Sequence, residues 1–400
     1  MYDSVKGFRD FYPEEMGSRR WAMDTIEDTA RRYGFRDIGT PALEPTEMYT
    51  DKSGEEIVEE LYSFEDKGGR EVALTPELTP KVARMVVAKQ QELSKPIKWV
   101  STRPFWRYEQ VQQGRFREFY QTNVDIFGSS EPDADAEILA VAVDMLADLG
   151  LADDDFEIRV SHRDILSGLL ESFDADVDTR EAIRAVDKRA KVDRDEYLDS
   201  LYEAGLSYDD AEAFDDLLET GEDDLDTLAE RSETVADATE NLRNVLDAAA
   251  DFGVRDQLTL SLSTARGLDY YTGVVFECFD ATGEVSRSVF GGGRYDDLIE
   301  GFGGQPTPAV GFAPGHATPS CSVNAPASGP PRNSRPTTTS CRSATLAPRR
   351  PESPGTCARR ATSSKPTSPT VPSAPRWATP TTSTPRRSSS SASATSRTTR

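Results

Sequence analysis

The sequence predicts an α+β fold in which an antiparallel or mixed sheet is built from separated parts of the chain and flanked by helices. Strand patterns occur in two groups, before residue 163 and after residue 251. Between them lies an acidic stretch, rich in alanine and leucine, with helical spacing and almost no strand pattern. After residue 315, Ser, Thr, Pro, Ala and Arg replace nearly all aliphatic residues, so this part lacks the side chains that a packed core needs.

These changes of composition divide the 400 residues into three parts. We predict a discontinuous core over residues 1–163 and 251–315, a helical insertion over 164–250, and a low-complexity tail over 316–400. We expect the tail to be disordered. A further hypothesis is a change of reading frame near Gly315, because Asp, Glu and Ala codons of a GC-rich gene read one base off give Thr, Ser, Arg and Pro. Translating the gene in its other two frames would decide it.

Charge separates the tail from the rest. Residues 1–315 contain 33 Lys and Arg against 69 Asp and Glu, a net charge of −36, whereas the tail contains 13 basic residues and one acidic residue. Such an acidic surface is typical of proteins that stay soluble in concentrated salt, and we infer a halophile. At molar salt the Debye length is about 3 Å, so the overall charge does not exclude an RNA partner.

Cysteine usage and hydropathy exclude several classes of protein. Cys278 is the one cysteine in the acidic part, so there is neither a disulfide framework nor the ligand spacing of a zinc site. We recognise no signal peptide at the start and no apolar run of membrane-spanning length. We therefore expect a cytoplasmic protein with no membrane partner and no protein-ligated metal.

The elements follow from the periodicity of apolar residues. Residues 18–33 have helical spacing and end at Gly34, which suits a helix C-cap, and a strand then leads to Pro41. Further strands are predicted over residues 72–74, 97–101, 116–127, 156–160, 274–279 and 309–313, and helices over 78–91 and 133–149. The strands at 97–101 and 116–127 are expected to form a long hairpin. The glycines at 291–293 predict a loop.

The hairpin is the most specific segment, with FWRYE at residues 105–109 and GRFREFYQ at residues 114–121. Pairing of its strands would bring four side chains together: Arg107, Glu109, Arg117 and Phe119. Alternation would put Arg115, Arg117, Phe119 and Gln121 on one face. Guanidinium groups bind phosphate oxygens bidentately and a phenylalanine offers a face to a base, so the pattern suits a nucleotide. A solvated charged hairpin is the alternative.

This hairpin resembles motif 2 of the class II aminoacyl-tRNA synthetases. In that family the first arginine holds the ATP α-phosphate and the phenylalanine packs on adenine. The resemblance implies that Arg107 binds the α-phosphate and that Glu109 and Phe119 position adenine, with Arg115 and Arg117 as further ATP contacts. The segment that ends at Pro41 is similar to motif 1, the dimer element of the family.

Two more segments resemble the signatures of histidyl-tRNA synthetases. They are ARGLDYYTG at residues 265–273 and GGGRYDDL at residues 291–298, and they occur in the family order. By this resemblance Arg266 acts at the α-phosphate while the carboxylate of histidine attacks it and expels pyrophosphate. Arg107, Arg266 and Mg²⁺ would stabilise the developing charge, with ATP entering as its Mg²⁺ complex.

A histidine pocket needs an anion for the α-ammonium group, an acceptor for an imidazole N–H, and aromatic walls. Glu77 matches the ammonium-binding glutamate of the family, with Leu78 and Thr79 beside it. The alternative for Glu77 is an acid favoured by a helix dipole. Arg107 and Arg266 would contact histidine as well as ATP.

The rest of this pocket also comes from the resemblance. Gln121 and Asp125 match polar side chains of the histidine pocket, in which Asp125 would accept from the ring nitrogen. An edge position in a sheet is the alternative for Asp125. Tyr270 and Tyr271 would supply the walls. Adjacent tyrosines point to opposite faces if the segment is extended, and we expect Tyr271 to be the closer.

The resemblance implies ATP-dependent activation of L-histidine and its transfer to tRNA(His) by a homodimer, with no DNA partner. The sequence departs from the pattern of the family after residue 315. Thr318 stands in place of the arginine that binds the γ-phosphate, and the expected anticodon-binding domain does not follow. Two alternatives are open: a non-catalytic regulatory paralogue that senses histidine, and an inactive truncated or frameshifted product. His162 and His316 lie in no motif, and we expect His162 to be structural or at the surface.

Overall fold

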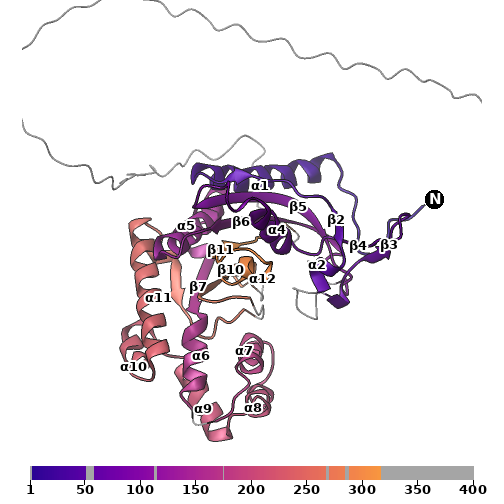
Figure 1. The fold of residues 1–400 in the computed structure, drawn as a ribbon. Helices are drawn as coiled ribbons and strands as arrows, with labels where there is room; N and C mark the ends of the chain where they lie inside the picture. The colour runs from indigo at the N-terminus through magenta and orange to yellow at the C-terminus, as the bar shows by residue number, and fades with distance from the viewer. Residues whose placement is uncertain are drawn as a thin grey trace, which may run out of the picture. The chain divides into compact units, whose positions relative to one another are not determined.

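Two sheets organise the computed structural model (Figure 1), which describes residues 2–50, 58–111, 115–173, 175–266, 270–283 and 288–316. The large sheet has the strand order β1-β5-β6-β11-β10-β9-β7-β8, and the small one β2-β4-β3. In the large sheet β1 runs parallel to β5 and β7 parallel to β8, while the other neighbours are antiparallel. The predicted mixed sheet flanked by helices is confirmed. The predictions for residues 317–400, Thr318 included, lie outside the described residues.

Strands from distant parts of the chain lie side by side in the large sheet. Its members are β1 (Arg36–Asp37), β5 (Ile97–Trp106), β6 (Glu118–Phe127), β7 (Phe156–His162), β8 (Leu258–Leu260), β9 (Val274–Asp280), β10 (Phe290–Arg294) and β11 (Ala309–Phe312). The small sheet consists of β2 (Leu43–Pro45), β3 (Ser63–Glu65) and β4 (Glu71–Leu74). The predicted hairpin is the β5–β6 pair, in which Ile97 faces Phe127 and Trp106 faces Glu118.

Gly291, Gly292 and Gly293 lie in the middle of β10, so the prediction of a loop there is wrong. The strand is crowded on both sides. A Cβ on Gly292 would lie 2.5 Å from the side chain of Phe312, and one on Gly291 would lie 2.8 Å from the carbonyl oxygen of Phe276. The glycines therefore fit a central strand between close neighbours, a role of glycine in sheets that differs from a turn.

One face of the large sheet is covered by α1 (Pro13–Arg32) and α5 (Pro132–Asp148). Buried apolar residues of both helices join those of the strands in one core cluster. Helix α1 begins at Pro13 rather than at the predicted Ser18, because a proline suits the first turn of a helix and acidic residues follow it there. The helix ends before Gly34, whose φ of 86° confirms the predicted C-cap.

The regular elements described between β7 and β8 are helical. They are α6 (Arg163–Glu171), α7 (Thr179–Lys188), α8 (Arg194–Glu203), α9 (Tyr208–Leu217), α10 (Leu225–Ala229) and α11 (Glu233–Asp251), with 3-10 turns at Glu222–Asp224 and Arg255–Gln257. Helix α11 packs against α5 and α6 (Figure 1), and the core cluster continues from the sheet into α6 and α11. None of the described helices is long and apolar enough to cross a bilayer.

The opposite face of the large sheet meets α4 (Thr79–Lys89) and α12 (Leu298–Gly301). A second apolar cluster lies here and includes Leu78, Phe105, Phe127, Tyr271 and Tyr295. Side chains alternate along a strand, so β6 sends Val124 and Ile126 to the α1 side and its odd-numbered residues to this side. The motif side chains gather on this second face.

Candidate active site

Glycines form the centre of this second face of the large sheet. Each leaves room for a side chain that the sequence analysis selected. An added Cβ would lie 2.3 Å from Oδ1 of Asp125 at Gly311, 2.9 Å from the Tyr271 ring at Gly293, and 1.9 Å from a guanidinium nitrogen of Arg266 at Gly291. Because these three glycines carry no side chain, the side chains of Asp125, Tyr271 and Arg266 can approach the backbone of the sheet closely.

Three tyrosines form an aromatic cluster over this floor. The ring centres of Tyr270 and Tyr271 are 4.8 Å apart, and Tyr295 lies 5.8 Å from Tyr270 and 6.5 Å from Tyr271. The two adjacent tyrosines would point to opposite faces only in an extended segment, but they precede β9 and do not follow strand alternation, and Tyr271 as the closer one stays a prediction. Both rings therefore reach the same side of the sheet.

Asp125 is buried in the middle of β6, with 7% of its surface exposed, so an edge position is wrong. Its Oδ1 accepts a hydrogen bond of 2.5 Å from the hydroxyl of Tyr295. Burial raises the pKa of Asp125 to about 7, against the opposing effect of this hydrogen bond. On the same strand face, Nε2 of Gln121 donates to the carbonyl of Ala313 over 3.1 Å.

Glu77 lies at the N-terminal end of α4, just before its N-cap residue Leu78, and both are buried. The charge of Glu77 contributes to raising the pKa of Tyr270, after the larger effects of burial and Tyr271, so the carboxylate acts electrostatically on the tyrosine cluster. Thr79 is half-buried in the first turn of α4. This location fits both an ammonium ligand and an acid favoured by the helix dipole.

The side chains predicted to bind the nucleotide gather at the loop end of the hairpin, where β5 ends and β6 begins. Nε of Arg107 donates to the carbonyl of Pro76 over 3.1 Å, beside Glu77, and its Cζ lies 5.5 Å from the Phe119 ring centre. A nitrogen of Arg107 is 4.0 Å from Oε1 of Glu109. The structure thus links the predicted α-phosphate ligand to both residues predicted to position adenine.

The two other arginines of this segment lie at its margin. Arg115 forms an ion pair of 3.2 Å with Glu109, and Nε of Arg117 donates to the carbonyl of Glu109 over 3.1 Å. The Arg117 guanidinium also stacks on the Tyr108 ring at 3.7 Å. Because β6 begins at Glu118, strand alternation applies to Phe119 but not to these arginines.

Arg266 lies across β9 and β10, with a guanidinium nitrogen 3.3 Å from Oε1 of Glu277 and its Cζ 5.7 Å from the Tyr271 ring centre. Burial lowers its pKa, but electrostatic interactions with Tyr271, Glu277, Tyr270 and Asp187 together outweigh burial, so the pKa is raised. The positive charge of Arg266 lowers the pKa of Tyr270, whereas the charge of Glu77 raises it. Arg266 and Asp125 both lie against the tyrosine cluster, and Arg107 is hydrogen-bonded to the carbonyl of Pro76, next to Glu77.

Sequence reasoning gave no role to Tyr295 or Glu277. A signal for Tyr295 was present, because it stands two residues after Gly293 in the second signature and therefore on the same side of the chain. Glu277 follows the first signature and lies two residues after Val275, which joins the apolar cluster of this face. The sequence alone does not show that Tyr295 contacts Asp125 or that Glu277 contacts Arg266.

Arg294 of the second signature points to the other face of the sheet. Its guanidinium forms a buried ion pair of 2.5 Å with Asp135 of α5 and donates to the carbonyl of Ser129 over 3.0 Å. Its contacts are those of a structural residue. His162 is structural too: it is buried, its Nδ1 accepts from the backbone N–H of Asp164 over 3.2 Å at the start of α6, and burial lowers its pKa to about 4.

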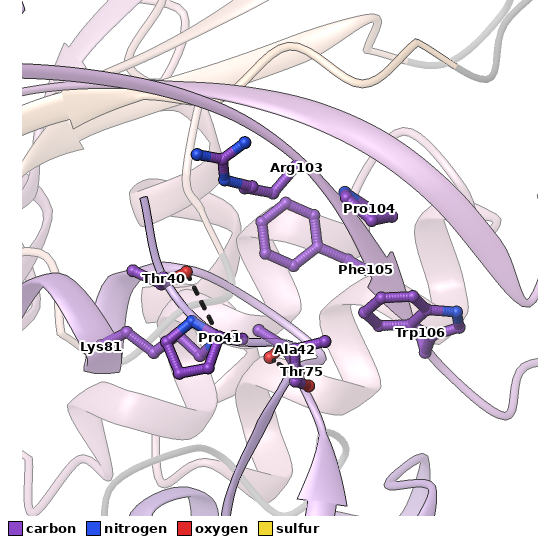
Figure 2. Close-up of a pocket in the computed structure, with 9 residues that line it drawn as sticks. All are labelled: Thr40, Pro41, Ala42, Thr75, Lys81, Arg103, Pro104, Phe105 and Trp106. Atoms are coloured by element: carbon purple, nitrogen blue, oxygen red, sulfur yellow. Dashed lines mark hydrogen bonds between the residues drawn. The ribbon is translucent and has the colours of Figure 1, made fainter. Parts of the chain in front are cut away.

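A pocket of about 230 Å³ lies elsewhere, between the end of β5, the segment after β1, and α4 (Figure 2). Lys81 is buried at one end, where its Nζ donates to the carbonyl of Pro41 and lies 3.4 Å from Oγ1 of Thr40. Arg103 and Phe105 line the opposite wall. None of the residues that line this pocket is among the predicted site residues, so we do not assign it to the candidate site. Within the described residues, no group of three or more His, Cys, Asp or Glu is arranged to hold a metal ion.

Comparison with known proteins identifies the family. The model of the histidyl-tRNA synthetase family matches residues 7–316. The chain belongs to the histidyl-tRNA synthetase family. The histidine–tRNA ligase of Haloarcula marismortui is 82% identical over 320 residues, which cover 80% of this chain and 74% of that relative. The ligase of Halobacterium salinarum is 73% identical with the same coverage. These relatives are consistent with the inference of a halophile.

Solved structures of histidyl-tRNA synthetases share the fold. The crystal structure of the enzyme from Nostoc sp. PCC 7120 superimposes with a TM-score of 0.70 at 26% identity and covers 79% of this chain and 74% of its own. A Bacillus halodurans protein described as an ATP phosphoribosyltransferase regulatory subunit/histidyl-tRNA synthetase gives a TM-score of 0.69 at 24% identity, covering 81% and 83%. At that identity the similarity concerns the fold alone. The resemblance stated from the two signatures is confirmed.

Proposed function

We propose that this chain activates L-histidine with ATP and transfers it to tRNA(His). One observation carries the proposal: Glu77, Asp125, Arg107 and Arg266 are connected around the tyrosine cluster on one face of the sheet. In the reaction, a carboxylate oxygen of histidine forms a bond to the α-phosphorus while the bond to the pyrophosphate oxygen breaks. Positioning and charge stabilisation suffice for such a transfer.

Histidine is held by groups that match its imidazole and its α-ammonium group. Asp125 accepts the imidazole N–H, and Glu77 binds the α-ammonium group. Gln121 adds a polar contact, and the rings of Tyr270 and Tyr271 flank the imidazole. Leu78 and Thr79 support Glu77 at the start of α4. The buried, hydrogen-bonded state of Asp125 supports this assignment, because such a carboxylate discriminates strongly in favour of a ligand that pairs with it.

ATP is held at the loop end of the hairpin, as its Mg²⁺ complex. Arg107 and Arg266 bind the α-phosphate, and the adenine packs on Phe119 beside Glu109. Arg115 and Arg117 are further ATP contacts. Guanidinium groups suit this role because their planar donors match phosphate oxygens and stay charged at all physiological pH values.

The remaining features of the proposal rest on the family. The chain forms a cytoplasmic homodimer whose interface includes α1 and the segment up to Pro41, because that segment resembles motif 1. Residues 1–163 and 251–315 form the catalytic core, and the helical segment at 164–250 is an insertion that lies near the acceptor stem of tRNA(His).

Histidine-dependent exchange of pyrophosphate into ATP, measured in molar KCl, tests the proposal. We expect exchange that is lost in Arg266→Ala and in Arg107→Ala, with histidine-independent exchange absent. Binding of histidine without any exchange would instead support a regulatory paralogue. A protein that neither binds histidine nor supports exchange would contradict both and support an inactive product.

A further inference from the structure

The guanidinium of Arg266 is held from one side by a carboxylate that no motif assigned. Glu277 lies in the middle of β9, directly opposite Gly291 of β10. Its Oε1 is 3.3 Å from Nη1 of Arg266 and also accepts a hydrogen bond of 3.0 Å from the hydroxyl of Ser288. One carboxylate oxygen therefore fixes the arginine and is itself fixed by a second donor.

The surroundings leave Arg266 little freedom on this side. Its Nη1 lies where a side chain at position 291 would be, and its Cζ lies over the ring of Tyr271. The charges of Asp187 and Lys191, from the region of α7, also act on Glu277, but less than Arg266 and Ser288 do. Arg266 and Glu277 are both mostly buried, with 20% and 18% of their side chains exposed. The pair is therefore screened less by salt than a surface pair.

We infer that Glu277, supported by Ser288, is a positioning residue that orients Arg266 toward the α-phosphate; the inference rests on the proposed function. A free arginine side chain loses rotamer entropy when it is fixed. If Glu277 already holds one edge of the guanidinium before the substrates bind, less side-chain entropy is lost when Arg266 acts in the activation step. The other guanidinium edge then faces the site with its donors in a defined plane.

The experiment compares Glu277→Gln, Arg266→Ala and the double variant in molar KCl. A non-hydrolysable sulfamoyl analogue of histidyl-adenylate measures binding by calorimetry, and pyrophosphate exchange gives kcat and KM. We expect Glu277→Gln to lower kcat by up to about 10²-fold through misplacement of Arg266, with a smaller effect on the Kd for histidine alone. Affinity for the analogue should fall as well. Exchange is lost in the Arg266→Ala background, so the comparison there uses affinity for the analogue. Adding Glu277→Gln to that background should not lower this affinity further, because Glu277 acts through that arginine.

Glu157→Gln is the matched control, because Glu157 pairs with Arg159 at 2.9 Å on β7, next to β9 in the same sheet. Ser288→Ala is the milder variant and should give a smaller loss in the same direction. If Glu277→Gln binds the analogue and catalyses exchange like the wild-type protein, or if its loss adds in full to that of Arg266→Ala, the inference is overturned. If the wild-type protein binds neither histidine nor the analogue, the proposed function itself fails.

Discussion

The hydroxyl of Tyr295 donates to Oδ1 of Asp125 over 2.5 Å, and the glycine at position 311 leaves the space in which the two side chains meet. Asp125 comes from β6 and Tyr295 follows β10, with β11 between these strands. The hydrogen bond therefore spans β6, β11 and β10 on the face of the sheet that carries the candidate site. It explains how a buried carboxylate is kept in one orientation without a cation as its partner.

Replacing Tyr295 by phenylalanine should weaken histidine binding. The substitution removes the donor and keeps the ring, so Asp125 loses its fixed orientation and a hydrogen bond to a charged group. Such a bond contributes about 1.5–3 kcal/mol, which corresponds to roughly a 10- to 100-fold higher Kd for histidine. Calorimetric titration with histidine measures this Kd in the wild-type protein and in the variant.

Tyr208→Phe is the control for that substitution, because Tyr208 also donates to an aspartate, Asp199, but is exposed on the helical segment. We expect its Kd for histidine to equal that of the wild-type protein. An unchanged Kd in Tyr295→Phe would show that the hydroxyl does not contribute to the histidine pocket.

Replacing Gly311 by alanine should displace Asp125 and Tyr295, because both side chains lie against the backbone at this position. The new Cβ would lie 2.3 Å from Oδ1 of Asp125, 2.7 Å from the carbonyl oxygen of Val124 and 3.0 Å from the hydroxyl of Tyr295. The backbone contact cannot be relieved by a side-chain rotation. We expect a loss of about 1–3 kcal/mol in the free energy of unfolding together with weaker histidine binding. Urea unfolding in molar KCl and histidine titration measure the two effects.

Gly301→Ala provides the matched comparison, because nothing lies within 4 Å of a Cβ at that position in α12. It should leave both quantities nearly unchanged. Wild-type stability and histidine affinity in Gly311→Ala would mean that the site tolerates a shift of Asp125.

Motif resemblance selected Arg107, Asp125 and Arg266, and their roles at the site stay predictions. The strand pattern correctly predicted the hairpin that carries the first two. The prediction of a loop at residues 291–293 was wrong, because glycine in a central strand depends on the side chains that pack against it. These neighbours, such as Arg266 against Gly291 and Phe312 against Gly292, lie in other segments of the chain.

The same reason explains the tyrosines. Local periodicity predicts that adjacent residues diverge, yet Tyr270 and Tyr271 converge because the segment before β9 is not a strand. Composition also could not show that Arg294 serves the opposite face of the sheet, since its partner Asp135 lies far away along the chain. Contacts between distant segments decide these details, and a single sequence does not display them.

The pH dependence of histidine binding should report the ionisation of Asp125. Burial raises its pKa to about 7, above the ordinary value near 3.9, so the folded protein binds this proton more tightly than the unfolded chain does. Between pH 4 and 7 the unfolded chain ionises at this residue while the folded protein keeps the proton, so the free energy of unfolding falls as pH rises. The anionic acceptor for the imidazole forms in the folded protein only near pH 7, so histidine affinity should rise around that pH.

Asp125→Asn isolates that effect, because the imidazole of free histidine titrates equally for both proteins. The ratio of the two Kd values should increasingly favour the wild-type protein from pH 6 to pH 8. Without histidine, the wild-type protein should lose stability relative to the variant over pH 4 to 7. A constant Kd ratio across this range would contradict the assigned role of Asp125.

Removing the guanidinium of Arg294 should destabilise the protein without touching the site face. Asp135 is 2% exposed and would keep a buried carboxylate with no cation, at a loss of about 3–5 kcal/mol in Arg294→Ala. The loss should grow as pH rises. With the arginine removed, burial raises the pKa of Asp135 without the opposing effect of Arg294, so the folded variant favours the protonated acid and loses stability as the carboxylate ionises.

Urea unfolding of wild-type and variant proteins at pH 5 and pH 8, in molar KCl, measures this difference. Arg184→Ala is the control, since Arg184 and Glu181 form an ion pair of 2.6 Å at the surface of α7, and it should change stability by less than about 1 kcal/mol at either pH. A loss in Arg294→Ala that is equal at both pH values would show that the arginine stabilises the core by packing alone. Arg294 belongs to the second histidine signature. A pH-dependent loss of stability in Arg294→Ala would show that it is part of this signature because it stabilises the fold, and not because it contacts histidine.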